Sequence, residues 1–124
     1  MHLPDFQYLA PKDPAELAAM LAEHGDAARI LSGGTDLLGQ MKSPGLRPDS
    51  LIDITGLEEL SNIKFDDGAG LVIGGAAKLE AVMDTPVVKE KYHGLWQSIE
   101  TIGARQIRTM GSLGGNLCNA SPAA

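Results

Sequence analysis

Apolar residues near the start of the chain recur with the spacing of an α-helix and give way to short apolar runs typical of strands. Asp13 suits the N-cap of a first helix, with Pro14 at the first helical position and Glu16 completing a capping box. Gly25 then interrupts the helical pattern. The sequence therefore predicts an amphipathic helix over residues 14–24.

The next apolar runs predict strands. Residues 27–31 and 50–55 are expected to form two strands, with a short helix between them that ends before Pro44. Residues 62–66 and 71–73, separated by Asp-Gly-Ala-Gly, predict a β-hairpin. Because strands and helices alternate along this part of the chain, the fold class is α/β or α+β.

The second half of the chain is predicted to be mainly helical. Residues 78–83 suit a short helix, and Pro86 suits the first position of another. A third helix is expected to end at Gly103, and residues 117–120 are expected to form a last strand. The buried face of the third helix carries Leu95, Ile99 and Ile102.

Composition and charge exclude several classes of function. The formal net charge is −6, from 10 basic and 16 acidic residues, which disfavours unspecific binding to nucleic acid. No apolar run reaches the length needed to span a bilayer, and the N-terminus lacks the pattern of a signal peptide. One cysteine forms no internal disulfide and cannot hold an iron–sulfur cluster alone. We therefore expect a reducing, cytoplasmic setting, no metal site and no membrane span.

The 15 glycines are more than a chain of 124 residues usually contains, and several gather in two segments. In the first, Ile30 to Leu38, an apolar strand enters a Gly-Gly turn from which a helix departs. Such a turn exposes backbone N–H groups that a phosphate can approach closely. The segment lacks both the P-loop lysine and the Gly-x-Gly-x-x-Gly spacing, and an ordinary strand-to-helix turn fits the same pattern.

The second glycine-rich segment is Arg108 to Leu117. It combines small residues with the hydroxyl of Ser112 and the side-chain amide of Asn116, which can bind the edge of a polar ligand. A glycine turn before an edge strand explains the same residues equally well.

Taken together, in this order and at this separation, the two segments resemble the FAD-binding subunit of the molybdenum hydroxylases. That family includes the xanthine dehydrogenases, the medium chain of aerobic carbon monoxide dehydrogenase and the 4-hydroxybenzoyl-CoA reductases. The resemblance covers essentially the whole chain. Its motifs are Gly33-Gly34-Thr35-Asp36-Leu37 for the first flavin loop, and Gln106-Ile107-Arg108, Gly111-Ser112-Leu113-Gly114-Gly115-Asn116 and Ser121-Pro122 for the second.

The resemblance implies a fold and a division of the chain. The fold is α+β, the two-lobed FAD-binding domain of the vanillyl-alcohol-oxidase type. Residues 1–55 would form a small N-terminal βαβ lobe that binds FAD, with a short linker at 44–48. Residues 56–124 would begin a second lobe that is incomplete, because subunits of this family are much longer.

The resemblance also implies the residues that bind FAD, whereas no catalytic acid–base residue and no metal ligand are expected. The first segment would hold the pyrophosphate through backbone N–H groups and the Thr35 hydroxyl. Ile102 would pack on the cofactor, and the end of the second segment would lie near the flavin. The full set is Ile30, Leu31, Ser32, Gly33, Gly34, Thr35, Asp36, Leu37, Ile102, Gly111, Ser112, Gly114, Gly115, Asn116, Ser121 and Pro122.

By the same resemblance the function is electron transfer. The expected partners are a large subunit with molybdopterin and a small subunit with 2Fe-2S clusters, and FAD would pass electrons to NAD or another external acceptor. Two alternatives are a stand-alone flavoenzyme of the same fold group and a truncated, non-catalytic assembly module.

Four further residues have two possible roles each. Cys118, in the expected last strand, is predicted to be a small buried apolar residue and not a redox thiol. Arg105 and Arg108 are expected to be surface charges, the alternative being a contact with a phosphate or with the iron–sulfur partner. Asp36 would either cap a helix or face the flavin groove.

Overall fold

The computed structural model describes residues 2–122, which fall into two compact units that divide between Glu58 and Glu59. Each unit is described by itself. The division of the chain into an FAD-binding lobe, 1–55, and an incomplete second lobe, 56–124, stays a prediction.

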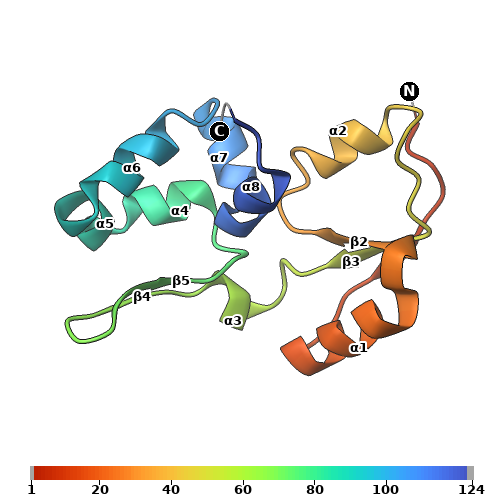
Figure 1. Cartoon of the computed structure of the whole chain (residues 1–124), viewed down its shortest axis with the longest axis horizontal. Helices are drawn as coiled ribbons and strands as arrows, with labels where there is room; N and C mark the ends of the chain where they lie inside the picture. The colour runs from red at the N-terminus through yellow and green to blue at the C-terminus, as the bar shows by residue number, and fades with distance from the viewer. Residues whose placement is uncertain (1, 123–124) are drawn as a thin grey trace. The chain divides into compact units, whose positions relative to one another are not determined.

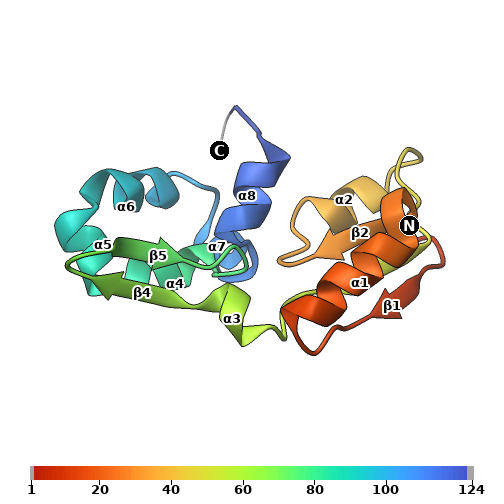
Figure 2. The ribbon, with the colours of Figure 1, turned by 60° about the horizontal axis from the view of Figure 1, so that its bottom comes forward.

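The first unit is a three-stranded parallel sheet with helices on both faces. The strand order is β1-β3-β2, so the last strand of this unit lies in the middle. Figures 1 and 2 show α1 and α2 on opposite faces of this sheet. The elements are β1 (Gln7–Leu9), α1 (Pro14–His24), a 3-10 turn (Gly25–Ala27), β2 (Ala28–Leu31), α2 (Leu37–Met41) and β3 (Ser50–Asp53).

Burial of the central strand on both faces holds this unit together. Leu51 and Ile52 of β3 point to opposite faces of the sheet, and both are almost completely buried, at 1% and 0% exposure. Helix α1 begins as predicted, because the Asp13 carboxylate accepts the Glu16 N–H at 2.8 Å. Local capping of α1 and burial of β3 on both faces thus support the βαβ arrangement that the sequence predicts.

The second unit combines an antiparallel hairpin with a group of short helices (Figure 1). Its core is apolar and is supplied mainly by α4, α5 and α6, with Leu79, Val82, Val88 and Ile99 at 2% exposure or less. The elements are α3 (Glu58–Ser61), which begins in the first unit, β4 (Ile63–Asp66), β5 (Gly70–Ile73), α4 (Leu79–Asp84), α5 (Pro86–Lys91), α6 (His93–Glu100), α7 (Arg105–Met110) and α8 (Leu113–Asn119).

The predicted last strand, 117–120, is wrong, because these residues belong to helix α8 and its C-cap. Ser112 is the N-cap of α8 and accepts the Gly115 N–H through its hydroxyl at 3.2 Å. Glycines in the first turn lower helix propensity, but the N-cap and bonds to a distant segment outweigh that cost. Cys118 is correspondingly exposed on α8, so its predicted burial is also wrong.

Two predicted element ends shift by two or three residues. The strand predicted to reach residue 55 ends at Asp53, whose carboxylate accepts both the N–H and the hydroxyl of Thr55 in a local turn. Helix α6 ends at Glu100, so Ile102 lies in the turn that follows. The α7 helix and strand β1 were not predicted, since each is short and has few apolar residues at a regular spacing.

No helix formed by residues 2–122 is both long and apolar enough to cross a membrane.

Candidate functional site

The first glycine-rich segment forms the loop between β2 and α2. The N–H groups of Gly33, Gly34 and Thr35 donate hydrogen bonds to no residue that the structure describes. Gly34 has φ +70°, and a Cβ at this position would lie 3.1 Å from the side chains of Leu31 and Leu38. The loop therefore needs glycine for its own conformation and leaves consecutive backbone donors unpaired.

Ser32 adds a fourth unpaired donor to this loop. Its Oγ is buried and has no hydrogen-bond partner within the described part of the chain. Such groups are rare in folded proteins, because a buried hydroxyl without a partner costs free energy. The donors of residues 32–35 suit an acceptor-rich anion, and the two phosphates of FAD are such a group. The residues present therefore fit the cofactor that the resemblance implies.

The other predicted residues of this segment have different surroundings. Ile30 is 46% exposed although it is apolar, and Leu31 and Leu37 are half-buried. Asp36 occupies the N-cap position of α2, but its side chain accepts no N–H group of that helix. The predicted side-chain cap is therefore absent, and the carboxylate of Asp36 lies exposed.

The backbone of the second glycine-rich segment is already hydrogen-bonded. The N–H groups of Leu113 and Gly114 donate to the carbonyls of Ala77 and Gly75 at 3.0 and 2.8 Å. The Gly115 N–H donates to the Ser112 hydroxyl. These three amides are thus not available to a phosphate, in contrast with those of the first loop.

Close backbone packing explains the glycine at position 114. A Cβ there would lie 2.6 Å from the Gly75 carbonyl oxygen, a backbone atom that cannot rotate away. Two further hydrogen bonds connect the same two segments. Lys78 Nζ donates to the Met110 carbonyl and the Leu79 N–H donates to the Gly111 carbonyl, both at 3.0 Å. The second glycine-rich segment is therefore held against residues 75–79 by hydrogen bonds and close backbone packing.

The side chains of the second unit that were predicted to contact FAD lie in different places. Asn116 is half-buried on α8, and its side chain bonds to no described residue, which leaves the amide able to bind a ligand. Ile102 is partly buried and packs against the apolar core of α4–α6. Ser121 is half-buried and Pro122 is exposed, beyond the end of α8.

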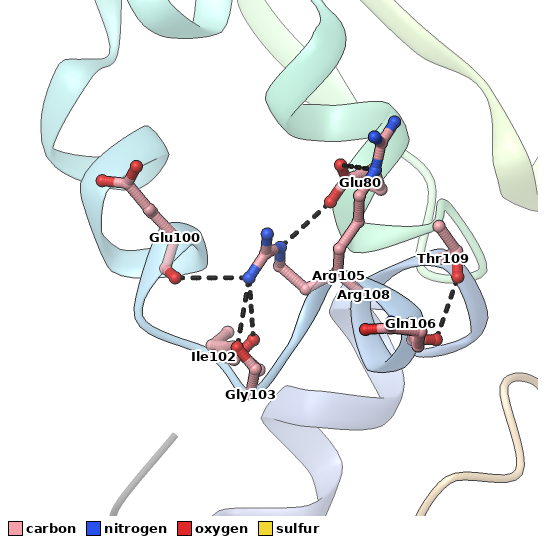
Figure 3. A network of polar contacts seen from close by, with 8 residues as sticks. All are labelled: Glu80, Glu100, Ile102, Gly103, Arg105, Gln106, Arg108 and Thr109. Atoms are coloured by element: carbon pink, nitrogen blue, oxygen red, sulfur yellow. Dashed lines mark hydrogen bonds and ion pairs between the residues drawn. The ribbon is translucent and has the colours of Figure 1, made fainter.

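The Arg108 side chain is largely covered, at 13% exposure, so its predicted surface position is wrong. Its Nε donates to Glu80 Oε2 at 3.0 Å, and the two side chains are 13% and 14% exposed. Its Nη1 lies 3.2–3.3 Å from the carbonyl oxygens of Glu100, Ile102 and Gly103 (Figure 3). The guanidinium thus satisfies the carbonyl end of α6 and joins it to α4.

Arg105 behaves as predicted for a surface charge. It pairs with Glu80 Oε1 at 2.9 Å, yet its own side chain is 72% exposed. Sequence analysis missed Glu80, which serves both arginines, because 28 positions separate it from Arg108 and no local pattern links them.

Two groups outside the glycine-rich segments have shifted pKa values, Tyr8 and Asp66. The Tyr8 hydroxyl donates to Asp53 at 2.6 Å, and this hydrogen bond raises the pKa of the phenol. The N–H groups of Ala69 and Gly68 donate to Asp66 and lower the pKa of its carboxyl. Both are local turn and sheet-edge contacts. The unpaired N–H groups of the first loop support anion binding.

Comparison with known proteins identifies the family of the chain. The family described as the FAD binding domain in molybdopterin dehydrogenase matches residues 4–124. The chain is 34% identical to the carbon monoxide dehydrogenase medium chain of Hydrogenophaga pseudoflava over 96% of its length, and 32% identical to the nicotinate dehydrogenase FAD-subunit of Eubacterium barkeri, also over 96%. The solved carbon monoxide dehydrogenase from Hydrogenophaga pseudoflava superposes with a TM-score of 0.92 at 34% identity, covering 98% of the chain.

The chain spans about two fifths of the length of these relatives, 41% and 40% of the two sequences and 42% of the solved chain. The matches confirm the predicted α+β fold and the predicted family. They show that the chain is homologous to the FAD subunits of oxidoreductases. The chain belongs to the family described as the FAD binding domain in molybdopterin dehydrogenase.

Proposed function

We propose that the chain binds FAD within the medium subunit of a molybdenum hydroxylase-type oxidoreductase, in which electrons pass between iron–sulfur clusters and an external acceptor such as NAD. The observation that carries this proposal is the loop of residues 32–35, with unpaired N–H groups and a buried, unpartnered hydroxyl. Family membership supports FAD as the group that these donors bind.

Binding and orientation are the tasks of this chain's own residues. FAD, when bound, supplies the redox chemistry. The N–H groups of Gly33, Gly34 and Thr35 would hold the pyrophosphate, since they are the unpaired backbone donors of the first loop. The second segment would contribute side chains, above all the Asn116 amide, because the N–H groups of residues 113–115 are bonded within the protein.

The proposed partner subunits are suggested by the names of the relatives. A large subunit with molybdopterin and a small subunit with 2Fe-2S clusters would complete the assembly, as the relatives include medium chains and FAD subunits of dehydrogenases. A cytoplasmic location is part of this proposal, and its support is the single cysteine, which forms no internal disulfide.

A fluorescence titration of the purified chain with FAD tests the proposal. We expect saturable binding, with ADP as a competitor and riboflavin without effect at the same concentration, because the loop donors suit phosphates. ADP carries the pyrophosphate and the adenine, whereas riboflavin carries only the flavin. Absence of FAD binding would instead favour the non-catalytic assembly module.

Metal analysis of the tagged protein recovered from its native source distinguishes the three-subunit assembly from a stand-alone flavoenzyme. Molybdenum and iron recovered together with FAD would support the three-subunit assembly. A stand-alone flavoenzyme would be recovered with FAD and without either metal.

A further inference from the structure

We propose that Arg108 is a positioning residue for FAD, whose guanidinium fixes the turn that contains Ile102 relative to residues 111–116. Arg108 lies outside the residues predicted to contact the cofactor, so its effect on binding is exerted through these neighbours. The inference rests on the proposed function, since it concerns how this chain holds FAD.

The contacts of Arg108 with the end of α6 carry the first step. Arg108 Nη1 donates to the carbonyl oxygens of Glu100, Ile102 and Gly103 at 3.2–3.3 Å (Figure 3). Contacts of this length add little to stability, but they bond one nitrogen to the backbone on both sides of the Ile102 side chain. The guanidinium therefore restricts where that side chain lies.

The contact of Arg108 with α4 carries the second step. Its Nε donates to Glu80 Oε2 at 3.0 Å, and both side chains are largely covered. Glu80 directly follows Leu79, whose N–H donates to the Gly111 carbonyl at 3.0 Å. The carboxylate thus belongs to the part of the chain that also holds residues 111–114.

The shape of the arginine side chain joins the two contacts. The guanidinium is planar and rigid, so a carboxylate bonded to Nε and carbonyls bonded to Nη1 are kept at a set separation. Lysine carries one nitrogen at the end of a flexible chain and does not reproduce this geometry. The position of Ile102 relative to residues 111–116 therefore depends on the fork of Arg108 and not on its charge alone.

Isothermal titration calorimetry with FAD and with ADP tests the inference on Arg108→Lys and Arg108→Ala. The Kd for FAD should rise about five- to tenfold in both variants, as expected when one contact with a ligand is impaired. The Kd for ADP should stay within about twofold, because the N–H groups assigned to the pyrophosphate lie in the first unit. A general loss of structure would not produce this selective change.

Arg105→Ala is the matched control. Arg105 pairs with the same carboxylate at 2.9 Å, but its side chain is exposed and bonds none of the carbonyls of the turn within the described residues. This variant should keep both Kd values of the wild type. Arg108→Lys carries the test by itself if Arg108→Ala does not fold, since lysine retains the charge beside Glu80.

Three results would contradict the proposal. Wild-type affinity for FAD in Arg108→Lys would overturn this inference and leave the proposed function intact. Equal increases in the Kd values for FAD and ADP would also overturn it, because Arg108 would then act only on the stability of the fold. Failure of the wild-type chain to bind FAD would overturn the proposed function and this inference together.

Discussion

Arg108→Ala is expected to destabilise the second unit by about 2–3 kcal/mol, whereas Arg105→Ala should cost less than about 1 kcal/mol. Both arginines pair with Glu80 at nearly the same distance, 3.0 and 2.9 Å. They differ in burial, since the Arg108 side chain is 13% exposed and that of Arg105 is 72% exposed. The comparison therefore isolates the effect of solvent on two ion pairs that share one carboxylate.

The magnitude follows from the contacts of Arg108. A hydrogen bond between charged groups contributes about 1.5–3 kcal/mol when water is excluded. The contacts of Nη1 with the carbonyls of Glu100, Ile102 and Gly103, at 3.2–3.3 Å, are long and add little. Removal of one partner from a fully buried pair costs about 3–5 kcal/mol, but Glu80 keeps Arg105 as a partner, so the full penalty is not expected.

Urea unfolding followed by tryptophan fluorescence measures both losses. Trp96 is the single tryptophan of the chain, and it packs against the apolar core of the second unit. Glu80→Ala, alone and combined with each arginine variant, completes two double-mutant cycles. We expect a coupling energy of about 1–2 kcal/mol for Glu80 with Arg108 and at most about 0.5 kcal/mol for Glu80 with Arg105.

Equal losses in Arg105→Ala and Arg108→Ala would refute this reasoning, because exposure would then not decide the strength of the pair. A second check is salt. Added salt should reduce the coupling of Glu80 with Arg105 and change that of Glu80 with Arg108 much less, since buried charges are screened less.

Two further predictions concern a packed glycine and a tyrosine. Gly114→Ala should destabilise the chain by more than about 1 kcal/mol, because its Cβ would lie 2.6 Å from the Gly75 carbonyl oxygen. Gly94→Ala is the control in α6: its Cβ would meet no atom within 4 Å, so it should stabilise the chain by about 0.5–1 kcal/mol. Equal urea midpoints of the two variants would contradict this prediction. The hydrogen bond to Asp53 raises the pKa of Tyr8 above 10.0, so its stabilising effect should be present below pH 10.0 and lost as the pH rises through the pKa of the folded state. Absorbance titration should show this phenol ionising later than in Asp53→Asn, and identical titrations of the two proteins would show that the hydrogen bond has no effect.

Much of the local structure could be predicted from the sequence, because its causes lie within a few residues. Asp13 and Glu16 begin α1 through contacts between near neighbours, and the short apolar run around Leu51 and Ile52 makes β3 a strand. The two glycine-rich segments together were specific enough to indicate the family, which the comparisons confirm.

The predictions that failed depend on contacts between distant residues. Residues 117–120, at the end of helix α8, were predicted to be a strand, since nothing near Gly114 shows that its N–H bonds the Gly75 carbonyl. Arg108 was predicted to be exposed, since its partner Glu80 is 28 positions away.

The sequence by itself thus determined the family, the α+β class and the position of both glycine-rich segments. Only the tertiary structure decided how those segments differ: the N–H groups of Gly33, Gly34 and Thr35 bond no described residue, whereas those of Leu113 and Gly114 bond residues 75–77. The physical reason is that a glycine leaves its backbone open to close approach, and the residue type does not specify whether a ligand or another part of the chain makes that approach.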